Sequence, residues 1–192
     1  MTFFLLCAMF TSMKTPILET DRLILRPTSM DDAPAIQKYF DNWNVIKNLS
    51  VAIPWPYPAD GAETFIRESI LPQMKTGKAH FWVITIKEQS NEAVGGISFG
   101  IDREKCEDHG HRGFWLAEPF WGQGLMTEAI TAVNGFVFDD LGIDKFYVMN
   151  VADNIASKRV KEKTGAKFVR YGELEHHSGT SKAEVWEVSK DD

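Results

Sequence analysis

The sequence predicts a single domain of mixed α/β class, and three observations support this fold class. Candidate strands and helices follow one another in the order β-α-α-β-β-β-α-β-α-β-β. A strand–helix–strand unit occupies the centre of the chain, over residues 113–151. The 192 residues, 44% of them hydrophobic and 25% charged, suffice for one domain with a full hydrophobic core.

The N-terminal half combines strands rich in branched apolar residues with two helices. Ser29 or Asp31 can cap a helix that runs through Tyr39. A polar connection before the last strand of this half predicts an antiparallel hairpin. The expected strands cover residues 21–27, 80–87, 93–102 and 111–116. The other expected elements are a weakly helical stretch over 42–49, an ordered proline-rich loop over 53–60 and a helix over 59–74.

The C-terminal half begins with a long helix over residues 127–141. Its apolar residues have the 3-4-4 spacing of one buried face, namely Ile130, Val133, Val137 and Leu141. Gly142 ends this helix. The next strand, Lys145–Val151, is almost continuously apolar, which is typical of a strand buried on both faces. The remaining elements are a helix over 155–164, ended by Gly165, and strands over 168–174 and 183–189.

The charge and the cysteine content exclude several classes of protein. A net charge of −6 argues against nucleic acid as a direct partner, because nucleic-acid-binding surfaces are basic. Two cysteines, Cys7 and Cys106, are too few for a disulfide framework and indicate a reducing cytoplasm.

The first ten residues are mostly apolar, yet they predict neither a membrane span nor a secretory signal. A span takes about 20 apolar residues, and the stretch lacks the basic start and the cleavage site of a signal peptide. We expect residues 1–12 to be an extension upstream of a start at Met13, with one domain over residues 13–192. The alternative is an apolar patch that a partner chain covers.

Gly122 and Gly124 lie between a strand and a helix, where free backbone amides can bind an anion. A Walker loop would need a G-x-x-x-x-G-K-[ST] motif, which the sequence lacks. A dinucleotide fingerprint would need a third glycine where Thr127 stands. The pyrophosphate of coenzyme A and a simple turn are both compatible with the two glycines.

Four motifs, which occur in a fixed order along the chain, resemble those of a known family and favour the coenzyme A pyrophosphate over a simple turn. They are "LETDRLILRP", "PWPYP", "GFWLAEPFWGQGLMTEA" and N-x-A-S-x-R-V-x-E-K-x-G-x-x-F, which starts at Asn154. Over roughly residues 18–175 the chain closely resembles the GNAT superfamily of N-acetyltransferases, and within it the branch of the RimJ/RimL ribosomal-protein acetyltransferases. The loop differs from the usual superfamily pattern at Trp121 and Met126.

The resemblance implies a fold and a function. The fold is a mixed, mostly antiparallel sheet of about six to seven strands, flanked by about four helices and split by a V-shaped cleft for acetyl-CoA. The function is direct transfer of an acetyl group from acetyl-CoA to a primary amine, at a peptide N-terminus or on a small molecule. A non-catalytic acetyl-CoA sensor is the alternative. The resemblance leaves open whether the protein is a monomer or a homodimer.

The same resemblance identifies the residues that hold the co-substrate. The residues expected to contact acetyl-CoA are Leu116, Ala117, Trp121, Gly122, Gln123, Gly124, Leu125, Met126, Thr127, Asn154, Ser157 and Lys163. Because the chain is acidic overall, the phosphates also need a local group of cations. This basic group consists of Lys158, Arg159, Lys161, Lys163, Lys167 and Arg170, among which Lys163 is the best candidate.

The resemblance also assigns the chemistry. Many superfamily members use a tyrosine as the acid where Lys161 stands here, and the RimJ/RimL branch uses a serine, which is Ser157. Asn154 caps the helix and can hold the pantetheine arm. Backbone amides near Leu116 polarise the acetyl carbonyl. His111 takes the place of a glutamate base, and a chain of water molecules is the alternative route for the amine proton.

Two further groups of residues complete the predictions. Trp43, Trp55 and Tyr57, in or near the proline-rich segment, either wall the acceptor pocket or pack a lid. The C-x-x-H-x-H pattern of Cys106, His109 and His111 suggests zinc, but a fourth ligand would have to come from His176 or His177. We therefore expect no metal.

Overall fold

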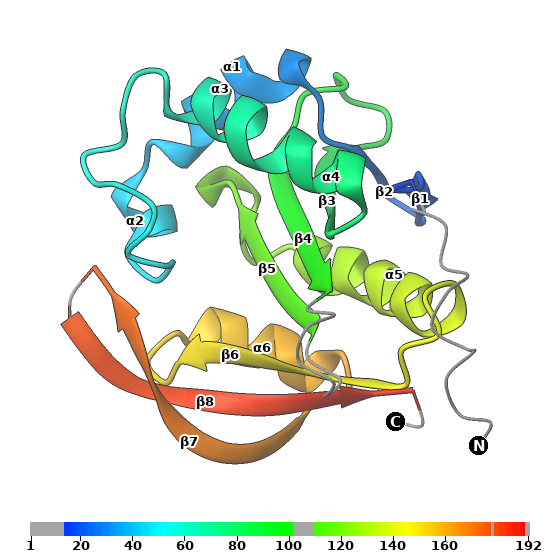
Figure 1. Ribbon diagram of the computed structural model, residues 1–192, viewed down its shortest axis with the longest axis vertical. Coiled ribbons are helices and arrows are strands. Elements are labelled where there is room, and N and C mark those ends of the chain that lie inside the picture. Colours follow the sequence, from blue (N-terminus) through cyan, green and yellow to red (C-terminus); the bar gives the residue numbers. More distant parts are fainter. Residues whose placement is uncertain (1–13, 102–109, 178, 191–192) are drawn as a thin grey trace, which may run out of the picture.

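The computed structural model describes residues 14–101, 110–177 and 179–190. The expected extension over residues 1–12 lies outside these ranges, as do Cys7, Cys106 and His109. Two antiparallel sheets organise the described residues (Figure 1). The first contains, in spatial order, β1 (Leu18–Glu19), β2 (Leu23–Pro27), β3 (Ala79–Ile86), β4 (Gly95–Ile101) and β5 (Gly110–Leu116). The second contains β6 (Lys145–Val151), β8 (Gly179–Ser189) and β7 (Lys167–His176).

The two sheets meet at β5 and β6. These strands are neighbours, yet among the described residues no strand pairing joins them. The predicted architecture, a mostly antiparallel sheet split near its centre, is thereby confirmed. The described strands number eight, because the two-residue β1 adds one to the predicted set.

Helices cover both faces of the first sheet. Those on one face, at the top of Figure 1, include α1, α3 and α4, while α5 packs against the opposite face. The expected helix over 59–74 is one continuous helical segment whose middle, Ile66–Ile70, is a π-helix. The α-helices are α1 (Ala33–Phe40), α2 (Trp43–Ile46), α3 (Gly61–Phe65), α4 (Leu71–Thr76), α5 (Leu125–Asp139) and α6 (Ile155–Lys163). Short 3₁₀ turns cover Met30–Asp32 and Glu118–Phe120.

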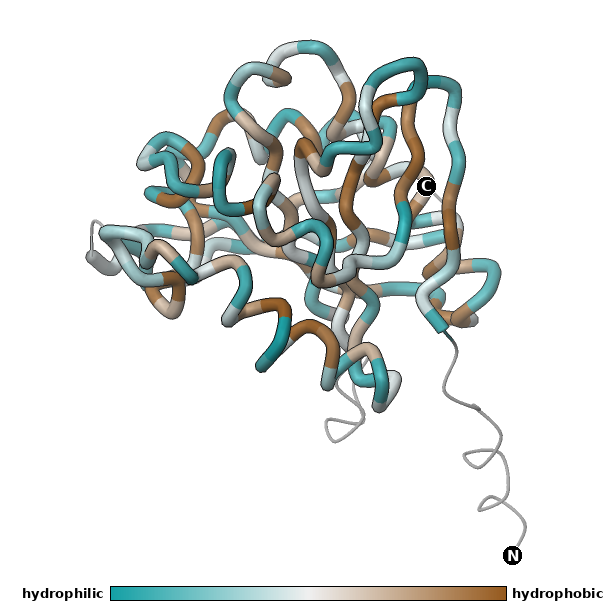
Figure 2. The backbone as a smooth tube through the Cα atoms, turned by 90° about the horizontal axis from the view of Figure 1, so that it is seen from above, coloured by the Kyte–Doolittle hydropathy of each residue, from teal (hydrophilic) through white to brown (hydrophobic). Residues whose placement is uncertain are grey.

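One hydrophobic core spans both sheets. It joins Leu23 and Trp82 of the first sheet to Phe146 and Trp186 of the second, and Val133 of α5 lies among them. In Figure 2 many of the hydrophobic stretches run through the interior, and hydrophilic stretches occupy many of the outer turns. The core therefore holds the sheets together where backbone pairing is missing.

The expectation that β6 is buried on both faces is wrong. Phe146, Val148 and Asn150 are buried, whereas Met149, on the other face, is 43% exposed. Tyr147 on that same outer face donates its hydroxyl to Glu187 at 2.8 Å. Both the buried and the outer positions of β6 carry large residues that count as apolar. The alternation between a buried and an exposed face therefore cannot be recognised in the sequence.

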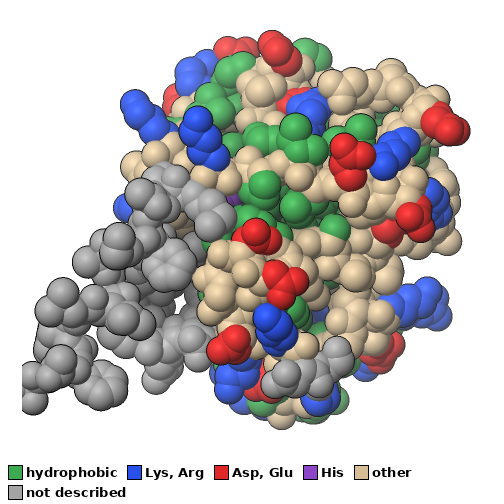
Figure 3. Space-filling model, turned by 90° about the vertical axis from the view of Figure 1, so that its right-hand side faces the viewer, with side chains coloured by type: hydrophobic (Ala, Val, Ile, Leu, Met, Phe, Trp, Pro, Cys, Tyr) green, Lys and Arg blue, Asp and Glu red, His purple; other side chains and the backbone are tan. Residues whose placement is uncertain are grey.

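The surface seen in Figure 3 carries acidic and basic side chains interspersed around a central hydrophobic group. Neither sign of charge dominates that face. No helix in the described part of the chain is long and apolar enough to cross a membrane.

Candidate active site

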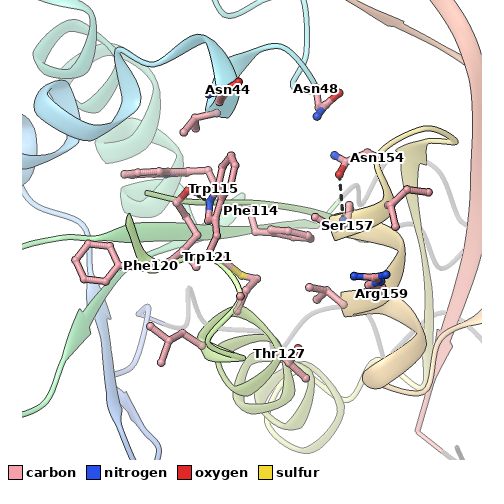
Figure 4. A pocket seen from close by; sticks show the side chains of 18 of the residues that line it. Asn44, Asn48, Phe114, Trp115, Phe120, Trp121, Thr127, Asn154, Ser157 and Arg159 are labelled. Atoms are coloured by element: carbon pink, nitrogen blue, oxygen red, sulfur yellow. Dashed lines mark hydrogen bonds between the residues drawn. The ribbon is translucent and has the colours of Figure 1, made fainter. Parts of the chain in front are cut away.

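A cavity of about 620 Å³ opens where the two sheets separate. Its size lies within the range typical of small-molecule sites. In Figure 4, Asn44 and Asn48 lie across the cavity from Thr127. On a third side, Ser157 and Arg159 project from α6. The lining residues come from three parts of the chain, within residues 44–49, 114–127 and 153–163.

The glycine loop gives this cavity an anion-binding wall. Gly122 and Gly124 have φ angles of +76° and +78°, a left-handed conformation that favours glycine. A Cβ atom at Gly122 would meet nothing within 4 Å, so the backbone is open to a ligand. The first hydrogen bond within α5 runs from the Glu128 amide to the Gly124 carbonyl at 3.1 Å. The preceding amides of the first turn therefore have no partner in the helix and can bind phosphate oxygens.

An ion pair between Arg22, which lies between β1 and β2, and Glu128 of α5 holds the glycine loop in place. Arg22 Nη2 lies 2.6 Å from Glu128 Oε2, and Arg22 Nη1 donates to the Gln123 carbonyl at 3.0 Å. Thr20 Oγ1 donates to the same carboxylate at 2.5 Å. The sequence predictions missed this clamp, although an acidic residue in the first turn of a helix was the available signal.

Two side chains order the start of α6. Asn154 Oδ1 accepts a hydrogen bond from the Ser157 amide at 3.1 Å, so Asn154 caps the helix as its position predicts (Figure 4). Both residues line the cavity. The cap fixes the first turn of α6 and so places Ser157 in the wall of the cavity.

Lys161 lies one turn further along α6 and is buried. Its side chain is 1% exposed, and its Nζ donates to Ser157 Oγ at 2.8 Å. Burial, and next the nearby positive charge of Arg112, lower the pKa of Lys161 to about 7, while Glu184 acts in the opposite direction. The lysine that stands where a tyrosine is common in the superfamily is thus bonded to the predicted acid.

The basic group on α6 and β7 divides into cations that face the cavity and cations that do not. Arg159 and Lys163 line the cavity, and Lys47 lies on another wall. Lys158 instead donates to Glu184 at 3.0 Å. Lys161 is buried, and neither Lys167 nor Arg170 lines the cavity. The positive charge available to an anion is therefore smaller than the sequence suggests.

Most of the residues expected to contact acetyl-CoA come together. Ten of the twelve line the cavity, and the exceptions are Ala117 and Gln123. The Ala117 amide donates to the Val94 carbonyl at 2.8 Å, so it is not free to polarise a ligand. Neighbouring amides of an edge strand point in opposite directions. The Leu116 amide therefore points away from β4, toward the split.

His111 is not brought to the cavity. It is exposed and pairs with Gly100, at the opposite end of β5 from Leu116. Five strand residues at about 3.4 Å each separate the two positions by about 17 Å. The predicted role of His111 as a base therefore loses its geometric support. Among the described residues no group of three His, Cys, Asp or Glu could hold a metal.

A second cavity of about 270 Å³ adjoins the first, and Leu49, Phe114 and Trp115 line both. None of the residues that line it is charged. Tyr57 is among them, and burial raises its pKa to about 12, with a smaller contribution from Asp41.

Of the three aromatic residues predicted to wall the acceptor pocket or pack a lid, Tyr57 lines the second cavity, and Trp43 and Trp55 line neither cavity. Their rings pack against each other, with centroids 5.2 Å apart, and each side chain is about 40% exposed. His177 contacts Trp43 at 5.8 Å between ring centroids. These side chains form a surface cluster beside the site.

Comparisons with known proteins agree with this geometry. Residues 22–167 match the model of the acetyltransferase (GNAT) domain family. The N-acetyltransferase YoaA of Bacillus subtilis (strain 168) is 30% identical over 173 residues, which cover 84% of this chain and 88% of YoaA.

Two solved structures share the fold. The RimL ribosomal L7/L12 α-N-protein acetyltransferase in complex with coenzyme A has a TM-score of 0.75 at 21% identity, covering 92% of this chain and 99% of RimL. RimJ of Mycobacterium smegmatis in complex with CoA-disulfide has a TM-score of 0.78 at 18% identity, covering 92% of this chain and 87% of RimJ. The resemblance to RimJ and RimL is thus confirmed at the level of the fold. With the family model matching most of its length, the chain belongs to the GNAT acetyltransferases and is an acyltransferase.

Proposed function

We propose that this protein transfers the acetyl group of acetyl-CoA directly to a primary amine. The observation that carries the proposal is the meeting of two cavities of different character at Phe114 and Trp115. One has an anion-binding loop, and the other is apolar and uncharged. A phosphate-bearing donor and an amine acceptor can enter them separately and react where they join.

The residues of the first cavity fit the phosphates of acetyl-CoA. The first-turn amides of α5 supply donors, and the open space over Gly122 lets a pyrophosphate approach the backbone. Arg159 and Lys163 supply the positive charge. Bound acetyl-CoA supplies a thioester, whose acyl carbon is electrophilic and whose thiol leaves readily.

Two groups of this chain can then assist the transfer. The Leu116 amide points into the split and can polarise the acyl carbonyl as negative charge develops on its oxygen. The Ser157 hydroxyl lines the cavity and can protonate the leaving sulfur.

The amine must lose a proton, and the position of His111 favours water over this histidine as the carrier. Among the described residues that line the two cavities there is no histidine, and the one carboxylate is that of Asp153 beside the start of α6. An amine that is partly neutral at pH 7 is therefore the better acceptor. An α-amine with a pKa of about 8 meets this condition, and a lysine with a pKa of about 10.4 does not. The proposed acceptor is therefore a peptide N-terminus or a small amine of similar basicity.

The second cavity refines the acceptor class. Its walls include Ile53, Phe81 and Trp115, and its polar side chains are hydroxyl or ring N–H groups without charge. A buried charged substituent there would be unpaired and costly. We expect acceptors with an apolar or aromatic group close to the amine.

Thiol release from acetyl-CoA with matched acceptors tests the proposal. Peptides that differ only in the first residue, leucine against aspartate, should show at least tenfold higher kcat/KM for leucine. Small amines with and without a carboxylate should follow the same order. If calorimetry detects acetyl-CoA binding while no acceptor in the panel is turned over, the protein is a sensor rather than an enzyme of this kind.

A further inference from the structure

Lys161 is the most unusual charged residue near the site. It lies four residues after Ser157, so both side chains share one face of α6. Its Nζ bonds to Ser157 Oγ at 2.8 Å and lies 5.7 Å from the centre of the Phe114 ring. Ser157 and Phe114 line the cavity, whereas Lys161 does not. The ammonium group is thus one hydrogen bond away from the cavity.

The charged neighbours of Lys161 do not neutralise it. Arg112 of β5 repels it, and the attraction of Glu184 of β8 is shared with Lys158. Arg112 is itself buried, donates to Asn134 Oδ1 and lies over the Phe146 ring. No salt bridge joins Lys161 to a carboxylate in the described part of the chain, so little opposes the loss of its proton.

A purely structural role does not explain a lysine at this position. An apolar side chain of similar length would fill the same space without the cost of burying a charge. Among the described residues, the one side chain to which Lys161 donates is that of Ser157, which lines the cavity. The arrangement links a group that can gain and lose a proton near neutral pH to the predicted acid.

We propose that Lys161 and Ser157 form a proton relay that delivers a proton to the sulfur leaving group during acetyl transfer. This inference rests on the proposed function. Lys161 acts through Ser157 and is therefore a positioning and relay residue, while Ser157 is the group that touches the reacting atoms.

Each bond that forms during the transfer is matched by a bond that breaks. The amine nitrogen forms a bond to the acyl carbon, the carbon–sulfur bond breaks, and its electron pair stays on sulfur. The Ser157 O–H bond breaks as the S–H bond forms, and an N–H proton of the Lys161 ammonium replaces the proton lost by Ser157. Lys161 is left as a neutral amine and recovers a proton from solvent through Ser157 once the product has left. The acylated nitrogen gives its extra proton to water.

The first test compares Lys161→Met and Lys161→Gln with the parent. Both should lower kcat by about 10- to 100-fold, as expected when an acid is removed. The acetyl-CoA affinity should stay within twofold, because Lys161 does not line the cavity. The parent kcat should also fall toward alkaline pH as Lys161 loses its proton, and this decline should be absent in Lys161→Met. Lys145→Met, which removes a half-exposed lysine of β6, is the matched control and should turn over like the parent.

The second test needs no turnover. Coenzyme A is bound to parent and to Lys161→Met, and the ionisation of its thiol is followed by the ultraviolet absorbance of the thiolate. A relay stabilises the thiolate, so the bound thiol should ionise at lower pH in the parent than in the variant.

The outcomes are distinct. Lower kcat with an unchanged pH of thiol ionisation would assign Lys161 a structural role and overturn the relay, as would unchanged kcat. If coenzyme A failed to bind the parent, the proposed function itself would fall, and the relay with it.

Discussion

At the scale of single residues, the burial of Lys161 has a consequence for stability as well as for chemistry. In the folded protein its pKa is about 7, against 10.5 for a free lysine side chain. Between these two pH values the unfolded chain binds more protons at this site than the folded chain does. The free energy of unfolding therefore rises with pH across this window, and the destabilisation from the buried charge is greatest below pH 7.

Urea unfolding at pH 7 and pH 9 measures this effect. The parent should gain stability between the two pH values relative to Lys161→Met, which lacks the titrating group. At pH 7 the variant should be at least as stable as the parent, because a buried charge has been replaced by an apolar side chain. Equal pH dependence in both proteins would show that Lys161 is not perturbed.

Ser157 is the residue on which the proposed acid chemistry depends. Ser157→Ala should lower kcat by about 10- to 1000-fold, as expected on removal of an acid or an oriented donor. Acetyl-CoA affinity should change much less, because the loop amides and Lys163 are the groups proposed to bind the phosphates. Ser69→Ala is the control, because Ser69 lies in the π-helical segment and lines neither cavity. If Ser157→Ala had the same kcat as the parent, Ser157 would not be the acid.

At the scale of elements, the glycine loop depends on a residue of β1–β2. Arg22, between the two strands, binds both the Gln123 carbonyl and the Glu128 carboxylate. Arg22→Met should lower acetyl-CoA affinity about tenfold or more, since the loop loses its support and the negative charge of Glu128 beside the loop is no longer balanced by a cation. Adding Glu128→Gln to Arg22→Met removes that carboxylate. Calorimetry should therefore find tighter binding in the double variant than in Arg22→Met alone, and the reverse order would contradict the clamp.

The elements could largely be predicted from the sequence, because periodicity and capping are local. The apolar spacing after residue 127 predicted α5, and Asn154 with Gly165 bounded α6. The prediction that both faces of β6 are buried was wrong, because Tyr147 and Met149 made its outer face look apolar.

The details of the site that depend on partner strands could not be predicted in this way. The distance of His111 from the cavity follows from the β4–β5 register, and the loss of the Ala117 amide follows from its pairing with Val94. Spacing alone puts Lys161 beside Ser157, but the lysines and arginine around them made that face look solvated.

At the scale of the whole molecule, the cavity lies where two sheets share a core and where no strand pairing joins them in the described part of the chain. A ligand that contacts both α5 and α6 bridges the two halves and should stabilise the fold. Coenzyme A at 100 times its Kd should add about 2.7 kcal/mol to the free energy of unfolding. For a chain of this size that corresponds to a rise in Tm of about 5–10 °C.

Scanning calorimetry with and without coenzyme A measures this shift. Lys163→Met, which loses a cation that lines the cavity, should show a smaller shift at the same ligand concentration. If saturating coenzyme A left the Tm of the parent unchanged, the cavity would not be its binding site.

The contact between Arg22 and Glu128 also bears on the order in which the molecule assembles. These residues are 106 positions apart in the chain, and such distant partners meet late because closing a long loop has a large entropic cost. A nascent chain that has emerged only through β5 has no partner for Arg22. In refolding experiments, the capacity to bind coenzyme A should return after the circular dichroism of the sheets, so ligand binding reports that folding is complete.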